Sequence, residues 1–85
     1  MYNFTTVKLG TTGTCVVTLQ TVLVMLHYLG ADGKPLVIDG ECGENTVYAI
    51  NSFQSNMRAY GFECGTNGEN DGCFGGACWK LLGVT

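Results

Sequence analysis

The sequence predicts an all-α fold, a small three-helix bundle with Asp-Gly-x-x-Gly turns. Three observations lead to this prediction. The chain has 85 residues, of which 46% are hydrophobic and 13% are charged, and this composition suits one packed domain. Apolar residues recur at helical spacing in two stretches. The Asp-Gly-x-x-Gly motif occurs twice, at 39–43 and 71–75, each time directly before a stretch that is typical of a helix.

The first helix is expected to follow a turn at residues 9–14. We expect Thr11 or Thr12 as its N-cap, because a threonine hydroxyl can accept a hydrogen bond from the first turn of a helix. Gly30 is expected as its C-cap glycine. The apolar stripe of this helix is predicted to consist of Val16, Leu19, Leu23 and Leu26.

The segments around the first helix contain extended and turn-forming residues. Residues 1–8 alternate in character and are expected to be extended, and the Asp-Gly-Lys-Pro sequence at 32–35 is typical of a turn. Residues 36–38 are expected to form a short extended segment that leads into the first Asp-Gly turn.

The second helix is expected from residue 44, and the third from 76 to 82. The stripe of the second helix is predicted to consist of Val47, Ile50, Phe53 and Met57. Residues 58–70 are glycine-rich and are expected to form a loop, while Trp79 and Leu82 of the third helix should face the core. No linker is evident, so residues 1–85 are expected to form a single domain.

Polar residues within this pattern are expected to hold the turns. Asp39 and Asp71 should bond the backbone of their own turns. Gln20 and Gln54 lie inside apolar stripes, and we expect them to bond loop backbone because buried amides need partners. Neither turn has acidic residues at three successive alternate positions, which disfavours calcium binding.

The charge of the chain argues against several partners. The net charge is −3, and the four cations do not cluster, so nucleic acid and anionic membranes are not expected partners. No apolar run approaches the roughly 20 residues that span a bilayer. The first residues lack a charged leader and an apolar signal core, which indicates either a piece of a larger secreted protein or export by another route.

Five cysteines are many for a chain of this length, and disulfides between them would mean an oxidising environment. We expect two disulfides and one leftover thiol, with five buried thiols as an alternative. A structural zinc site is disfavoured, because no Cys-x-x-Cys pair occurs. The disulfide candidates are Cys15, Cys42, Cys64, Cys73 and Cys78.

Residues 9–83 together resemble the small peptidoglycan-binding domain that accompanies bacterial and phage cell-wall hydrolases. The resemblance lies in one helix-opening motif and in two copies of a turn followed by a helix. The matching residues are Leu9, Gly10, Gly13, Val16, Leu19, Gln20, Leu23, Leu29 and Gly30, then 39–43, Thr46, Ala49, Ile50, Phe53 and Gln54, then 71–75, Trp79 and Leu82. Cys42 and Cys78 depart from the pattern, since they stand where the family has an aromatic residue and a threonine.

The resemblance implies a non-catalytic, extracellular module that binds the cell wall and targets a tethered hydrolase. Its partner would be the glycan or the stem peptide of peptidoglycan, with no cofactor. Catalysis is not expected, because His27 is the one histidine and no set of paired catalytic groups is evident, although a Cys–His27 pair stays open. The alternative function is a protein-interaction or spacer domain of the same shape.

A non-catalytic glycan binder is expected to use exposed aromatic rings and amides. Such residues lie off the core stripe of the second helix, at the end of the first helix and in the long loop. The candidates are Tyr28, Tyr48, Asn51, Ser55, Tyr60 and Asn67.

Overall fold

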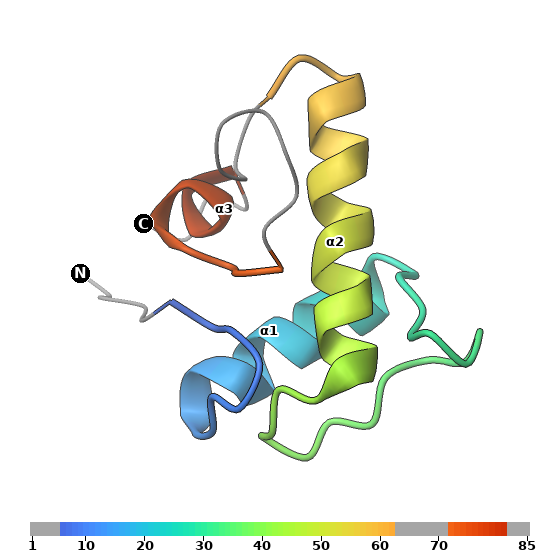
Figure 1. Ribbon diagram of the computed structural model, residues 1–85, viewed down its shortest axis with the longest axis vertical. Helices are drawn as coiled ribbons and strands as arrows, with labels where there is room; N and C mark the ends of the chain where they lie inside the picture. The colour runs from blue at the N-terminus through green and yellow to red at the C-terminus, as the bar shows by residue number, and fades with distance from the viewer. Residues whose placement is uncertain (1–5, 63–71, 82–85) are drawn as a thin grey trace.

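A computed structural model describes residues 6–62 and 72–81 and confirms the all-α prediction. The helices are α1 (Thr14–Met25), α2 (Glu44–Ala59) and α3 (Gly76–Leu81). Figure 1 shows α2 as the longest helix, with α1 crossing near its N-terminal end and α3 lying to one side. The described residues form no strand, so residues 36–38 are not part of a sheet.

The core lies where the three helices meet, and most of the predicted stripe residues are in it. An aromatic series runs through the core: the rings of Phe53 and Phe74 are 5.2 Å apart, and those of Phe74 and Trp79 are 4.8 Å apart. Leu82 lies outside the described residues. The buried apolar residues are Val7, Val16, Leu19, Leu23, Leu36, Cys42, Ala49, Ile50, Phe53, Phe74, Cys78 and Trp79.

The start of α1 differs from the prediction, because its N-cap is Gly13 and neither Thr11 nor Thr12 caps it. Gly13 has φ 119°, a conformation that favours glycine, and it makes no side-chain cap. The Thr11 hydroxyl instead accepts a hydrogen bond from the Lys8 amide at 3.1 Å, within the turn that precedes the helix.

The end of α1 also differs, because the helix stops at Met25 and Gly30 is not its cap. His27 takes the left-handed position with φ 67°, and the Tyr28 amide bonds the Leu23 carbonyl at 2.9 Å. These features define a Schellman motif. Leu26 is consequently 49% exposed rather than in the core. Glycine is required at position 30 for a different reason, because a Cβ there would lie 2.8 Å from Cβ of Asn45.

The same ending recurs on α2. Gly61 has φ 91°, and the Phe62 amide bonds the Met57 carbonyl at 2.8 Å. Residues 58–59 therefore belong to the helix and not to the predicted loop. Gln20 and Gln54 are 34 residues apart, as are His27 and Gly61. The helix and its cap are thus repeated as a unit.

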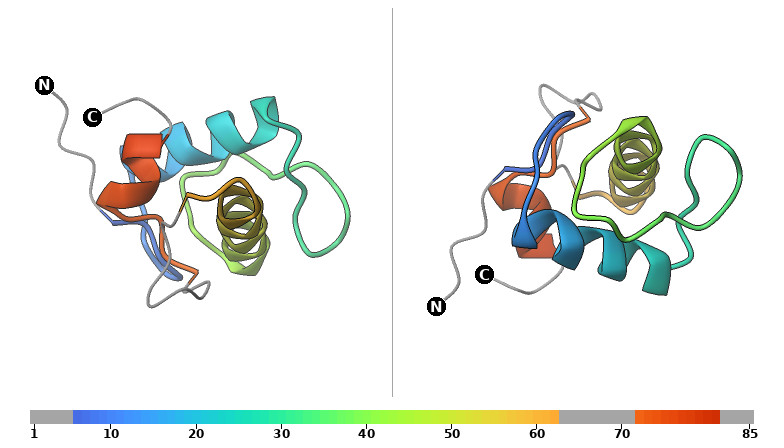
Figure 2. Two further views of the ribbon diagram at one scale, coloured as in Figure 1. Left: turned by 90° about the horizontal axis from the view of Figure 1, so that it is seen from above. Right: turned by 90° about the horizontal axis from the view of Figure 1, so that it is seen from below.

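The segment before α1 joins the two Asp-Gly turns. Val7 exchanges backbone hydrogen bonds with Phe74 at 3.1 and 2.7 Å, in an isolated antiparallel bridge. A few residues later, Gly10 donates to the Cys42 carbonyl and the Cys42 amide donates to Thr11, both at 2.9 Å. Figure 2 shows this segment running beside the residues that lead into α3. One short segment therefore ties both turns into the fold.

Candidate functional site

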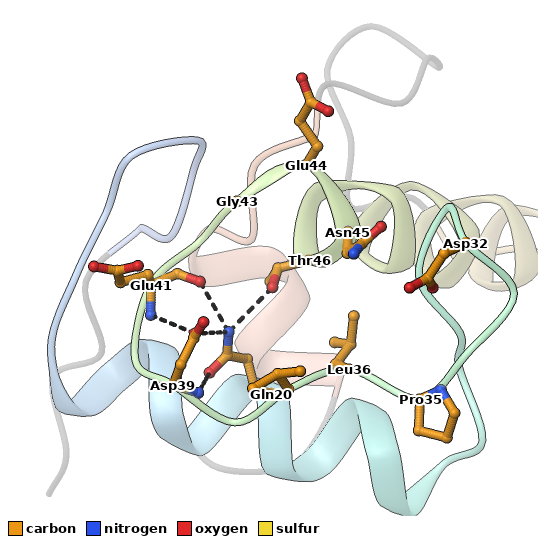
Figure 3. Close-up of a pocket in the computed structure, with 11 residues that line it drawn as sticks. Gln20, Asp32, Pro35, Leu36, Asp39, Glu41, Gly43, Glu44, Asn45 and Thr46 are labelled. Atoms are coloured by element: carbon orange, nitrogen blue, oxygen red, sulfur yellow. Dashed lines mark hydrogen bonds between the residues drawn. The ribbon is translucent and has the colours of Figure 1, made fainter.

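The first Asp-Gly turn is held by the buried side chain of Gln20 from α1. Its Oε1 accepts hydrogen bonds from the amides of Asp39 and Gly40 at 3.1 and 3.0 Å. Its Nε2 lies within hydrogen-bonding distance of the Asp39 carboxylate, the Glu41 carbonyl and the Thr46 hydroxyl, at 2.9–3.1 Å (Figure 3). Gln20 therefore links α1, the turn and the first residues of α2, and its predicted role is confirmed.

The second turn is held in a matching way by Gln54 from α2. Its Nε2 donates to the Cys73 carbonyl at 3.0 Å and lies 3.7 Å from Sγ of Cys78. Cys73 and Cys78 occupy the positions in the second motif that Glu41 and Thr46 occupy in the first. Gly40 and Gly72 share a positive φ, at 77° and 68°. The described parts of the two turns thus have the same construction.

Asp39 stabilises its own turn, as predicted. Its carboxylate accepts a hydrogen bond from the Glu41 amide at 3.0 Å. That bond, together with the bond from Gln20, holds the pKa of the Asp39 carboxyl below its ordinary value. The corresponding prediction for Asp71 lies outside the described residues.

A pocket beside the first turn is lined by four carboxylates (Figure 3). Asp39 and Glu41 lie at one end and Asp32 at the other, while Glu44 points away from them (Figure 3). The Asp32 carboxylate is already used, because it accepts a hydrogen bond from the Lys34 amide at 3.0 Å. Within residues 6–62 and 72–81, no group of three or more potential ligands is placed to hold a metal ion.

The outward face of α2 carries a second surface, which contains most of the predicted binding residues. Tyr48, Asn51 and Ser55 line a shallow pocket together with Ser52 and Asn56. An adjoining pocket shares Tyr48, Ser52 and Asn56 and extends across Tyr28 to the loop after α1. We call these two pockets together the α2 surface. It brings together Tyr28, Tyr48, Asn51 and Ser55, which come from two separate parts of the chain.

Contacts with the core orient the aromatic residues of this surface. The Tyr28 ring packs edge-on against Phe53, with ring centroids 5.9 Å apart, and its hydroxyl accepts a hydrogen bond from Nδ2 of Asn56 at 3.0 Å. Tyr48 is 51% exposed and presents its ring to solvent. Asn51 is half-buried and lies next to Gly72 of the second turn. Tyr28 and Asn51 therefore connect the surface to the fold, and Tyr48 is its most accessible ring.

Two predicted residues do not join this surface. Tyr60 is 76% exposed at the C-terminal end of α2 and lines neither pocket. Asn67 lies outside the described residues. The sequence prediction missed Ser52 and Asn56, although both follow Tyr48 at intervals of four residues, a spacing that indicates one face of a helix.

The four described cysteines are thiols, and no disulfide joins any two of them. Cys42 and Cys78 are buried, whereas Cys15 and Cys73 are half-buried. Burial raises the pKa of the Cys42 thiol to about 11, and the neighbouring Cys73 adds to this effect because two negative charges would repel. The expected disulfides are therefore not seen among these four residues, and the buried-thiol alternative describes Cys42 and Cys78 but not Cys15 and Cys73. Cys64 lies outside the described residues. His27 is exposed, and no cysteine lines the pocket to which it belongs.

Comparison of the chain with known protein families, characterised proteins and solved structures finds no match. In the described part of the chain, no helix combines the length and the apolar character needed to cross a bilayer.

Proposed function

We propose that this protein is a non-catalytic module that binds peptidoglycan and targets a tethered cell-wall hydrolase. One observation carries the proposal: four of the residues that the sequence predicts as glycan contacts lie together on the α2 surface, namely Tyr28, Tyr48, Asn51 and Ser55. Aromatic rings, amides and hydroxyls in a shallow pocket are the groups that sugars require for stacking and hydrogen bonding.

The repeated construction of the turns supports the family resemblance on which the proposal rests. Each resemblance motif pairs a helix glutamine with an Asp-Gly turn, and both glutamines bond the turn that follows them. The matched residues thus act together in space, as the residues of a shared fold should. Binding by such a module raises the local concentration of an attached enzyme at its polymeric substrate.

The proposed location is extracellular, at the cell wall. Disulfide support of the fold belongs to the same proposal, because oxidising compartments favour it. Cys15 and Cys73 are the more accessible of the described thiols and are the first positions to map by mass spectrometry after secretion.

Sedimentation with purified, insoluble peptidoglycan tests the proposed function. We expect the intact 85-residue chain to pellet with the polymer. Tyr48→Ala should bind about tenfold more weakly, because it removes the exposed ring of the surface. Tyr60→Ala is the matched control, since it removes an exposed tyrosine at the C-terminal end of the same helix, outside the surface.

Two results would contradict this proposal. If the folded chain stays in solution, the peptidoglycan-binding role fails and the protein-interaction or spacer role takes its place. If the chain pellets but Tyr48→Ala and Tyr60→Ala bind equally well, the α2 surface is not the binding site. Circular dichroism of each variant checks that the fold is retained.

A further inference from the structure

We propose that the α2 surface recognises the N-acetylated sugar strand of peptidoglycan rather than its peptide stems. This inference rests on the proposed function and names the part of the polymer that would be bound. It follows from the charge of the surface, from the spacing of its polar groups and from the contacts that orient them.

The charge of the α2 surface matches a neutral ligand. Of the described residues that line its two pockets, none is an aspartate, glutamate, lysine or arginine. Peptide stems carry several carboxylates, and a site for them needs cationic partners. Arg58 is the one cation of α2 and lines neither pocket. The sugar strand offers hydroxyls and acetamido groups, which bind through neutral donors and acceptors.

The surroundings of the surface disfavour the peptide stems further. Glu44 lies one turn before Tyr48 on α2, and the neighbouring pocket holds the carboxylates of Asp39 and Glu41. The chain as a whole carries a net charge of −3. A ligand with several carboxylates would therefore approach against a repulsive field.

The polar groups are spaced along α2 as an extended sugar strand requires. Tyr48, Ser52 and Asn56 follow one another at intervals of about one helical turn. Over these residues the helix advances by about 12 Å, given a rise of about 1.5 Å per residue, which is comparable to the length of a disaccharide. Stacking of one ring on Tyr48 would place the ring one disaccharide further along the strand beside the Asn56 amide.

The far end of the surface is held in place before any ligand arrives. The Asn56 amide donates to the Tyr28 hydroxyl, and the Tyr28 ring rests on Phe53 in the core. A group that is already oriented loses little conformational entropy on binding. Tyr28 therefore acts as a positioning residue for Asn56, whose amide is the expected partner of the acetamido oxygen.

Competition experiments on the intact chain separate the two parts of the polymer. The chain is first bound to insoluble peptidoglycan and is then challenged with one of three soluble probes: an N-acetylglucosamine hexamer, a glucose hexamer without acetamido groups, or a free stem pentapeptide. We expect the N-acetylglucosamine hexamer to release the chain at a concentration at least tenfold lower than either of the other probes requires.

Three variants test which residues bind the N-acetylglucosamine hexamer. Tyr48→Ala should weaken binding of the N-acetylglucosamine hexamer and of peptidoglycan by the same factor, about tenfold. Tyr28→Phe keeps the ring and removes the hydroxyl, so it should weaken the hexamer severalfold and narrow its advantage over the glucose hexamer. Glu44→Gln removes the carboxylate one turn before Tyr48 on α2 and should leave hexamer binding unchanged.

The outcomes distinguish this inference from the function on which it rests. If the chain does not bind peptidoglycan at all, both the proposed function and this inference are refuted. If it binds peptidoglycan and the stem peptide alone releases it, or if Glu44→Gln abolishes binding by removing a partner for a stem amine, the function stands and this inference is overturned. Equal release by both hexamers would overturn the recognition of the acetamido group.

Discussion

A single buried amide fixes the geometry of the first turn. Gln20 is almost fully buried, and its side chain meets two backbone amides, a backbone carbonyl and two side chains. Buried polar groups without partners destabilise a protein, so the turn and the glutamine depend on each other. Bonding of this kind specifies one conformation of the turn, which hydrophobic contacts alone would not.

Replacement of Gln20 should therefore destabilise the fold strongly. We expect Gln20→Leu to lower the free energy of unfolding by about 3 kcal/mol, because the amides of Asp39 and Gly40 lose their acceptor. Urea denaturation measures this change. Thr18→Ala on the same helix is the control, since Thr18 bonds only the Thr14 carbonyl of its own helix, and a change within about 0.5 kcal/mol is expected there. Equal effects of the two variants would refute the role assigned to Gln20.

The Cys42 thiol makes stability depend on alkaline pH. Its folded pKa of about 11 lies above the ordinary value, so the folded state keeps the proton where the unfolded state has lost it. The protonated Cys42 thiol therefore contributes fully to the stability of the fold below about pH 8.5, and this contribution is lost as the pH rises towards 11. Between these values the free energy of unfolding of wild type should fall by about 1 kcal/mol more than that of Cys42→Ser, because only wild type has the buried Cys42 thiol, which must give up its proton. Parallel urea titrations at both pH values would disprove this effect if the two proteins changed alike.

At the scale of the elements, the two turns depend on glycine for two separate reasons. Gly40 has φ 77°, which disfavours any residue with a side chain, and a Cβ there would lie 3.2 Å from Val17. Gly72 repeats both features, with φ 68° and a Cβ position 3.1 Å from Val47. The turns must approach the preceding helices closely for Gln20 and Gln54 to reach them.

Alanine substitutions separate the effect of the positive φ from the effect of close packing. Gly33 has φ 75° but open space around its Cβ position, so Gly33→Ala reports the backbone conformation alone, at about 1 kcal/mol. Gly40→Ala should lower the free energy of unfolding by about 1 kcal/mol more than Gly33→Ala does, because Val17 must move as well. Thermal unfolding of the two variants measures the difference. Identical melting temperatures would mean that the turn is not packed against α1.

The sequence was sufficient to predict the helices but not where they end. Stripes such as Leu19–Leu23 and Ile50–Phe53 are direct consequences of burying one helix face, so their period was visible. The end of α1 depends on His27 in a left-handed conformation. A glycine at this position would have predicted a helix end, but a histidine does not. The sequence pattern instead predicted Gly30 as the C-cap, whereas the structure shows that a glycine is required there because the backbone packs closely against Asn45.

The candidate site was predictable to the extent that it lies on one helix. Tyr48, Asn51 and Ser55 follow helical spacing, which assigns them to a common face. The bond between Asn56 and Tyr28 joins residues that are 28 positions apart, and its existence depends on how α1 crosses α2. No local pattern encodes that crossing, so Asn56 was missed.

At the scale of the whole molecule, the segment before α1 completes the core. Val7 is fully buried, and its backbone pairs with Phe74 of the second turn. Val7→Ala should lower the free energy of unfolding by about 2 kcal/mol, through lost burial and a small cavity. Leu9→Ala is the control in the same segment, because Leu9 is 63% exposed, and it should change stability by less than about 0.5 kcal/mol. A chemical denaturation midpoint for Val7→Ala equal to that of Leu9→Ala would show that the segment is only loosely attached.

The pairing of Val7 with Phe74 has a consequence for biosynthesis. The two residues are 67 positions apart, so the earliest described segment must wait for nearly the last before it finds its partner. Closing so long a loop carries an entropic cost and slows the final step. On a ribosome, α1 and the first turn can associate with α2 as they emerge, but the nascent chain keeps Val7 unpaired until Phe74 leaves the exit tunnel. The domain should thus reach its native state only after residue 74 has emerged from the ribosome.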